Sequence, residues 1–319
     1  GEVHIAEPNL KENLKNAIES GNLKFQSKPC TSEIFLIAVP TPIINDKDQK
    51  NIPNLDYVFS AIKSISKVIK KDNLIIIEST CPVGTSEKAH NLLCELSNLS
   101  SSEIHLAYCP ERVIPGNTLH ELVANERVIG GFTNKASLMA RDFYSNFCQG
   151  KIHLTNSKTA ELVKLTENSF RDVNIAFANE ISLICDKYSV NPYELISLAN
   201  KHPRVNILNP GCGVGGHCIA VDPWFLINSS PEITDLIQAG RNVNIKKTSW
   251  IVKKLLEESY KFELKNNRKP VFGFFGLSFK PDIDDLRGSP SIEIINKLKK
   301  KDLNIICCEP HISKHEFIR

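Results

Sequence analysis

Short β-branched runs alternate with stretches of helical apolar spacing along the first half of the chain. This alternation is typical of strands and helices that follow one another in a parallel α/β layer. The pattern predicts strands at 34–39, 74–77, 104–108 and 127–130, and helices at about 54–71 and 85–96. Such sheets bind ligands at the loops that follow the carboxyl ends of their strands. Thr41, Thr80 and Glu111 follow three of these strand ends and are therefore candidate site residues.

The pattern becomes helical over one long stretch from Ser157 to about Tyr188. Ser157 or Thr159 is expected to cap the first turn of this helix. Its apolar stripe is expected to comprise Leu162, Leu165, Phe170, Val173, Phe177, Ile181 and Ile184. Further helices are predicted at about 192–199 and 233–260, on either side of a glycine-rich loop at 209–217. A strand at 271–275, a helix at about 290–300 and a strand at 303–307 then restart the α/β pattern.

Composition narrows the class of protein. The chain is 41% hydrophobic and 24% charged, and its net charge of +3 gives no reason to expect nucleic acid or an anionic membrane as a partner. No apolar run approaches the roughly 20 residues that span a bilayer, and the N-terminal residues lack a signal-peptide pattern. We therefore expect a cytoplasmic protein.

Ten cysteines are sparse at this length, and none forms a CxxC pair. Most are expected to be reduced thiols that pack as small apolar side chains. Cys218 differs because it ends a loop with four glycines between positions 211 and 216. Glycines let a backbone approach a ligand, and a thiol there can become a nucleophile where cations or N–H dipoles favour the thiolate. Asp222 is expected one helical turn further on, on the same face; the alternative is a flexible loop beside a buried thiol.

Two other polar groups are ambiguous from their spacing. Lys164 and Asn168 stand four residues apart on the long helix, near Glu161, and a solvated polar face is the commoner meaning of such spacing. In the segment 279–290, Lys280, several carboxylates and Arg287 precede a helix N-terminus, which suits either an anion site or a solvated turn. His217, Cys218 and Cys212 match no common zinc spacing, so no metal is expected.

Together these segments resemble the UDP-glucose/GDP-mannose dehydrogenase family. The matching motifs occur in order through nearly the whole chain: AVPTP (38–42), ESTCPVG (78–84), YCPER (108–112), TAELVKLTEN (159–168) with Asn179-Glu180, HPRVN (202–206), GGHCIAVDPW (215–224) and FKPDIDDLR (279–287). The resemblance implies a Rossmann-like NAD-binding domain at 1–156, a central helical domain with one long helix at 157–264, and a Rossmann-like UDP-sugar domain at 265–319.

The resemblance also implies a reaction. Family members oxidise C6 of a nucleotide sugar to a carboxylate with two NAD+, through a cysteine thiohemiacetal and then a thioester. By resemblance, Cys218 is the nucleophile, Lys164 stabilises an oxyanion, and Asp222 positions water or acts as a base together with Lys164 and Asn168. Glu111 would be the general base for thioester hydrolysis.

The remaining contacts follow from the same resemblance. Thr80 would hold water or lie on the nicotinamide side of the site. The substrate contacts would be Arg204 (across a dimer interface), Asn206, Gly215 and Lys280. The NAD contacts would be Thr41, Thr80 and Arg287. A homodimer through the long central helix is expected.

Two features refine the expected substrate. Pro115 stands where enzymes acting on UDP-glucose carry a second glutamate, which argues against UDP-glucose. The segments 171–180 and 219–224 resemble the N-acetylmannosamine branch, so the expected substrate is UDP-N-acetyl-D-mannosamine, for surface polysaccharide precursors. UDP-N-acetylglucosamine is the nearest competing substrate. Two alternatives belong to other functional classes: a catalytically silent fragment that binds UDP-sugar, and a two-electron 3-hydroxy acid dehydrogenase.

The family begins with a strand, a GxGxxG turn, a helix and a second strand that ends in an acidic residue. Residues 1–8 align just after this unit. We therefore expect the first βαβ unit, and the end of the last domain, to lie outside this sequence, which by itself would then bind NAD weakly or not at all.

Overall fold

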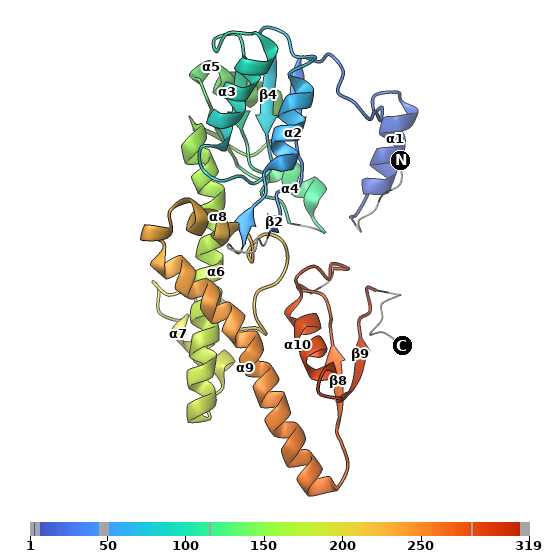
Figure 1. Cartoon of the computed structure of the whole chain (residues 1–319), viewed down its shortest axis with the longest axis vertical. Coiled ribbons are helices and arrows are strands. Elements are labelled where there is room, and N and C mark those ends of the chain that lie inside the picture. The colour runs from blue at the N-terminus through green and yellow to red at the C-terminus, as the bar shows by residue number, and fades with distance from the viewer. Residues whose placement is uncertain (1–2, 4–6, 45–50, 115, 282, 313–319) are drawn as a thin grey trace. The chain divides into compact units, whose positions relative to one another are not determined.

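The computed structural model describes residues 3, 7–44, 51–114, 116–281 and 283–312. The chain forms two compact units, Gly1–Thr166 and Glu167–Arg319 (Figure 1). Pro115 and Asp282 lie outside the described residues, as do Gly1, Glu2 and residues 4–6. The domain boundaries expected at 156/157 and 264/265 stay predictions.

The first unit is built on a five-stranded sheet in the order β1-β4-β5-β6-β7. Its strands are β1 (Ile34–Ile37), β4 (Leu74–Ile77), β5 (His105–Tyr108), β6 (Arg127–Gly131) and β7 (Ile152–Asn156). The first three run parallel, β6 runs antiparallel to β5, and β7 runs parallel to β6. The predicted parallel α/β layer is therefore confirmed, with one antiparallel pairing, that of β5 with β6, which was not predicted. In its described residues, the connection from β5 to β6 contains the short helix α4 (Thr118–Ala124). It does not return to the start of β5, so β6 begins at the carboxyl end of its neighbour.

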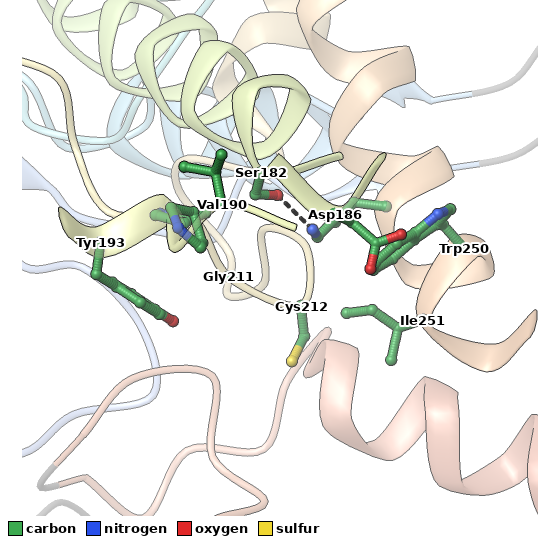
Figure 2. Close-up of a pocket in the computed structure, with 11 residues that line it drawn as sticks. Ser182, Asp186, Val190, Tyr193, Gly211, Cys212, Trp250 and Ile251 are labelled. Carbon is green, nitrogen blue, oxygen red and sulfur yellow. Dashed lines mark hydrogen bonds between the residues drawn. The ribbon is translucent and has the colours of Figure 1, made fainter. Parts of the chain in front are cut away.

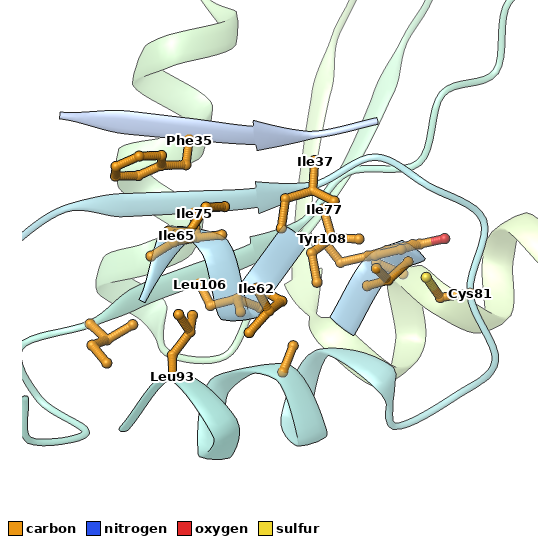
Figure 3. Packing of buried hydrophobic residues seen from close by; sticks show 14 residues of the cluster. Phe35, Ile37, Ile62, Ile65, Ile75, Ile77, Cys81, Leu93, Leu106 and Tyr108 are labelled. Atoms are coloured by element: carbon orange, nitrogen blue, oxygen red, sulfur yellow. The ribbon is translucent and has the colours of Figure 1, made fainter. Parts of the chain in front are cut away.

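Helices cover both faces of this sheet. On one face, α2 (Asp56–Ile65) and α3 (Thr85–Ser97) contribute Ile62 and Leu93 to a core with Ile75 and Ile77 (Figure 3). On the other face, α5 (Asn134–Tyr144) packs against Leu74 and Ile76. Every residue of β4 and β5 is buried, because both faces are covered.

Several elements of the first unit were not predicted. They are α1 (Leu10–Glu19), the two-stranded antiparallel pair β2 (Ile43–Ile44) and β3 (Ile52–Pro53), α4, α5 and β7. The predicted helix at 54–71 is shorter in the structure, and the strand predicted at 34–39 ends at Ile37.

Helix α6 (Ser157–Tyr188) has the predicted bounds and carries residues of both units. The second unit continues with α7 (Pro192–Ala199), α8 (Asp222–Ser229), a 3-10 turn (Pro231–Ile233) and α9 (Asp235–Asn266). The chain then forms β8 (Val271–Phe275), α10 (Pro290–Lys299) and β9 (Asn304–Cys308), in which β8 and β9 are parallel neighbours. The α/β, helical, α/β plan is confirmed, while α8 was not predicted.

Two predictions about α6 were wrong. Its first turn is capped by Asn156, whose Oδ1 accepts from the Thr159 N–H at 2.9 Å, rather than by Ser157 or Thr159. The expected apolar stripe is largely on the outside: Phe170, Phe177 and Ile184 are exposed, as is Leu162. The buried positions that replace them include Asn168, Asp172, Asn179 and Ser182. Asn168 binds Asp222 of α8, and the other three bind polar side chains of α9.

Candidate active site

The first unit brings Thr41 and Thr80 to neighbouring strand ends. Ser79, after β4, accepts a hydrogen bond from the Val39 N–H at 2.8 Å and donates to the Val39 carbonyl at 2.7 Å. These bonds fix the segments that follow β1 and β4 side by side, so the half-buried Thr41 and Thr80 stand beyond the same end of the sheet. Sheets of this kind bind ligands beyond the carboxyl ends of their strands, where these two hydroxyls lie.

Glu111 and Lys164 lie together in the same unit. The Lys164 Nζ donates to the Glu111 carbonyl at 2.8 Å. The Glu111 carboxylate accepts at Oε1 from the N–H groups of Arg112 and Val113, at 2.6 and 3.1 Å. The structure therefore places the Lys164 ammonium against the backbone of Glu111, and both residues were expected in catalysis.

Glu161, which shares a helix with Lys164, has a structural role. Its buried carboxylate accepts from the Gly84 N–H at 2.7 Å and from the Ser86 N–H and Oγ at 2.8 and 2.7 Å. Burial raises the pKa of this carboxyl, against the opposing effect of those hydrogen bonds. It thus caps the start of α3 and ties the 78–84 motif to α6.

Cys218 and Asp222 are related as their spacing predicted. The Asp222 N–H donates to the Cys218 carbonyl at 2.8 Å, which makes one helical turn that leads into α8. The buried Asp222 carboxylate accepts at Oδ2 from Asn168 Nδ2 at 2.6 Å, while Cys218 is exposed. An accessible thiol thus stands one turn from a carboxylate whose orientation an amide fixes.

The glycines of the 211–216 loop serve close packing within the second unit. A Cβ on Gly215 would lie 2.7 Å from the Gly288 carbonyl oxygen, and one on Gly216, at φ 81°, would lie 2.7 Å from the Phe279 ring. Gly211, Gly213 and Gly216 match a GxGxxG spacing but follow no strand, so they are not a dinucleotide phosphate turn. The space that we expected for a ligand is filled here by Phe279, Gly288 and Pro290.

This packing joins the cysteine loop to the Lys280–Arg287 motif. The Gly216 N–H donates to the Arg287 carbonyl at 3.1 Å. His217 Nδ1 lies 3.7 Å from Asp285 Oδ2, and Arg287 binds Asp285 through Nη2 and Nε, at 2.6 and 2.9 Å. Asp285 raises the pKa of Arg287, with a smaller contribution from Cys218. The Arg287 guanidinium is therefore close enough to Cys218 for their charges to interact. Arg287 was expected on NAD phosphates, but in this structure it is paired with Asp285.

The other predicted substrate contacts are less closely integrated. Lys280 is half-buried. The Asn206 carbonyl accepts from Asn174 Nδ2 at 3.0 Å, which ties the 202–206 motif to α6. Within the part of the chain that the structure describes, the exposed Arg204 side chain makes no hydrogen bond with Cys218, Asp222 or Lys280.

A separate cavity of about 380 Å³ lies in the second unit between α6, α7, α9 and the start of the glycine loop (Figure 2). Cys212 lines it, and desolvation by its neighbours raises the pKa of the Cys212 thiol. Buried Lys247, also in the lining, donates to Ser182 Oγ at 2.5 Å. A raised pKa disfavours the thiolate, so Cys212 is a poorer nucleophile than its position in the loop would suggest.

Sequence reasoning missed three residues near Glu111: Glu78, Arg127 and Tyr144. Arg127 left a signal, a charged residue at the first position of a buried strand, and Glu78 is the first residue of the 78–84 motif. Among the described residues, no group of three or more His, Cys, Asp or Glu side chains is arranged to hold a metal ion. No helix in the described ranges is both long and apolar enough to cross a bilayer.

Comparisons with known proteins agree with the motifs. Models of three domains of one family, the UDP-glucose/GDP-mannose dehydrogenases, match the chain: the NAD-binding domain at 1–148, the central domain at 158–246 and the UDP-binding domain at 273–319. UDP-N-acetyl-D-mannosamine dehydrogenase of Campylobacter jejuni is 49% identical over 98% of this chain and 77% of its own length. NDP-N-acetyl-D-galactosaminuronic acid dehydrogenase of Ralstonia solanacearum is 47% identical over 97% of this chain and 73% of its own length.

Solved structures show the same relationship. The UDP-D-ManNAc dehydrogenase of Pyrococcus horikoshii superposes with a TM-score of 0.89 at 39% identity, covering 99% of this chain and 74% of that one. The UDP-N-acetyl-mannosamine dehydrogenase of Staphylococcus aureus superposes with a TM-score of 0.85 at 40% identity, covering 100% and 74%. The chain therefore belongs to the UDP-glucose/GDP-mannose dehydrogenase family of NAD-dependent nucleotide-sugar dehydrogenases.

Proposed function

We propose that this protein oxidises C6 of UDP-N-acetyl-D-mannosamine to the carboxylate, giving UDP-N-acetyl-D-mannosaminuronate for surface polysaccharide precursors. The observation that carries this proposal is the exposed Cys218 thiol, one helical turn from an Asp222 carboxylate that Asn168 holds at 2.6 Å. The substrate is suggested by relatives named as UDP-N-acetyl-D-mannosamine dehydrogenases, at up to 50% identity.

The proposed chemistry centres on the thiol. NAD+, when bound, accepts a hydride in each of the two oxidations. The Cys218 thiolate adds to the C6 aldehyde, so that the carbon becomes tetrahedral and can be oxidised again, and the resulting thioester keeps the intermediate bound. Lys164 donates to the oxygen on C6 while it carries negative charge. Asp222, with its orientation set by Asn168, positions water or takes up a proton.

The thioester must then be hydrolysed. Glu111 is the proposed general base: its carboxylate takes a proton from water, the water oxygen bonds to the thioester carbon, and the C–S bond breaks to release Cys218 as a thiolate. Thr80 is proposed to hold this water or to contact the nicotinamide, with Thr41 beside it. Lys280 is proposed for the substrate pyrophosphate, Arg287 for NAD phosphates, and Arg204, Asn206 and Gly215 for the remaining substrate contacts.

A second substrate is favoured by one observation. The Ralstonia solanacearum relative, at 47% identity, is named NDP-N-acetyl-D-galactosaminuronic acid dehydrogenase, so UDP-N-acetylgalactosamine is the alternative substrate that we propose. The four sugar nucleotides to compare are therefore UDP-N-acetylmannosamine, UDP-N-acetylgalactosamine, UDP-N-acetylglucosamine and UDP-glucose. The proposal requires the highest kcat/KM with the first of these.

Counting NADH tests the reaction class. The full-length protein, incubated with UDP-N-acetylmannosamine and excess NAD+, is expected to form two NADH per sugar consumed. Cys218→Ala should abolish this turnover, whereas Cys308→Ala, which removes another exposed thiol of the same unit, should retain it. No NADH from the unaltered protein, or full four-electron turnover by Cys218→Ala, would contradict the proposal.

A further inference from the structure

Arg127 occupies an unusual position for a charged residue in the first unit. It is the first residue of β6, and its side chain is only 5% exposed. Because β6 runs antiparallel to β5, this first residue lies at the carboxyl end of β5, where the chain continues to Cys109 and Glu111. Arg127 Nη1 stands 3.5 Å from Glu111 Oε2.

The guanidinium is held from two other sides. Its Cζ lies 4.6 Å from the centre of the Tyr144 ring and 5.7 Å from that of Phe147. Its Nη2 donates to the Leu122 carbonyl at 3.2 Å. Stacking on an aromatic face and a hydrogen bond to the backbone fix a planar group more firmly than the flexible ammonium of lysine would be fixed.

Tyr144 is fixed in turn by a carboxylate. Its buried hydroxyl donates to Glu78 Oε1 at 2.5 Å. Glu78 directly follows β4, two residues before Thr80, and its burial raises the pKa of its carboxyl. The row Glu78–Tyr144–Arg127–Glu111 therefore connects the segments that follow β4 and β5 with the first residue of β6 and the last residue of α5.

The two oxygens of the Glu111 carboxylate are held by different groups. Its Oε1 accepts two backbone N–H groups, whereas its Oε2 faces the Arg127 guanidinium. The side chain is 31% exposed, so without Arg127 its Oε2 would be free to turn toward solvent. A general base must stand within hydrogen-bond reach of the proton that it removes, and a displacement of about 1 Å can cost roughly 100-fold in rate.

We infer that Arg127 is a positioning residue for Glu111 in the thioester-hydrolysis step, and that Tyr144 and Glu78 hold Arg127 in place. This inference rests on the proposed function of Glu111. It concerns only the last step, in which a proton passes from water to Glu111, the hydroxide oxygen bonds to the acyl carbon, and Cys218 leaves. The two oxidations that precede it do not use the row.

Two variants test the inference. Arg127→Lys keeps the charge but loses the planar group, and Tyr144→Phe keeps the ring over Arg127 but removes the bond to Glu78. Tyr57→Phe, at an exposed tyrosine of α2, is the matched control. In a rapid-mixing experiment with UDP-N-acetylmannosamine and NAD+, Arg127→Lys should form NADH in the first turnover at the unaltered rate. Its steady-state rate should fall by roughly 10- to 100-fold.

Intact-mass spectrometry of the quenched reaction provides the deciding readout. Arg127→Lys should accumulate the sugar thioester on Cys218, Tyr144→Phe should do so to a smaller extent with a several-fold slower steady state, and Tyr57→Phe should match the unaltered protein. If Arg127→Lys fails to fold, Tyr144→Phe decides. Equal slowing of the first and later turnovers without thioester, or unaltered kinetics in both variants, would overturn the inference. Failure of the unaltered protein to form NADH would instead overturn the proposed function.

Discussion

Asp72 links the stability of the first unit to pH. Its Oδ1 lies 2.8 Å from Lys135 Nζ and 3.0 Å from Nε2 of the buried His105. The hydrogen bond from Lys135, followed by that from His105, lowers the pKa of Asp72 from 3.8 to about 2. Because the pKa is lower in the folded than in the unfolded chain, the carboxylate stabilises the fold above about pH 4. This contribution is lost as pH falls toward 2.

We predict that Asp72→Asn reduces the difference between the free energies of unfolding at neutral and at acid pH. Asparagine tolerates the left-handed backbone at this position, where φ is 65°, so the variant removes mainly the charge. Urea unfolding at pH 6 should show the variant less stable than the unaltered protein, with a smaller difference at pH 3. A difference of equal size at both pH values would show that the carboxylate charge is not its cause.

The sequence revealed those site residues that have a partner within one helical turn along the chain. Cys218 and Asp222 are one turn apart, and Lys164 and Asn168 are one turn apart on a helix with predictable bounds. Arg127 had no such local partner: it reaches Glu111 only because β6 reverses direction, which no periodicity reports. Glu161 was placed near the correct face, but its hydrogen-bond donors are 75 and 77 residues away in the chain.

At the scale of elements, α6 and α9 meet through a buried polar network. Arg241 Nη1 donates to Asp172 Oδ1 at 2.6 Å, and Asn244 Nδ2 donates to the same oxygen at 2.8 Å. Asn179 accepts from the Gly211 N–H and donates to Asn244, each at 2.9 Å. The network therefore also anchors the start of the loop that leads to Cys218.

Removal of the cation from this network should be costly. Arg241→Met leaves the fully buried Asp172 carboxylate without its charge partner, and we predict a loss of about 3–5 kcal/mol in the free energy of unfolding. Addition of Asp172→Asn removes the uncompensated charge, so the double variant should recover part of that loss. Urea unfolding of the three proteins measures this, and a double variant that is less stable than Arg241→Met would refute the explanation.

The sequence predicted some elements correctly and others not, and each outcome has a physical cause. Long or strongly apolar segments such as α6, β4 and β8 have the bounds that their sequence pattern predicts. The prediction of which face of α6 is buried was wrong, because the hydrophobic pattern does not reveal that Asp172, Asn179 and Ser182 bind polar partners on α9. The direction of β6 depends on the path of the preceding loop rather than on the residues of the strand itself.

At the scale of the whole molecule, the apolar side chains that α6 does not bury need a partner. Phe170, Phe177 and Ile184 recur every seven residues, and their exposed fractions are 66%, 52% and 48%. Side chains at this spacing lie along nearly one line of a helix, as at the seam of a pair of helices. Because a line of large exposed apolar residues is unfavourable in water, we propose that the stripe packs on a second copy of the chain.

This proposal predicts a dimer that one charge can break. The unaltered protein should elute in size-exclusion chromatography with light scattering at twice the 35.7 kDa chain mass. Phe177→Glu places a carboxylate in the middle of the stripe and should shift the protein to the monomer mass, with its circular dichroism unchanged. Phe25→Glu is the matched control, since Phe25 is 64% exposed outside α6, and it should remain dimeric. If Phe177→Glu is still dimeric, the interface lies elsewhere. Self-association through this helix would be contradicted if the unaltered protein is monomeric up to about 100 µM, which is tenfold or more above the dissociation constant expected of a stable dimer.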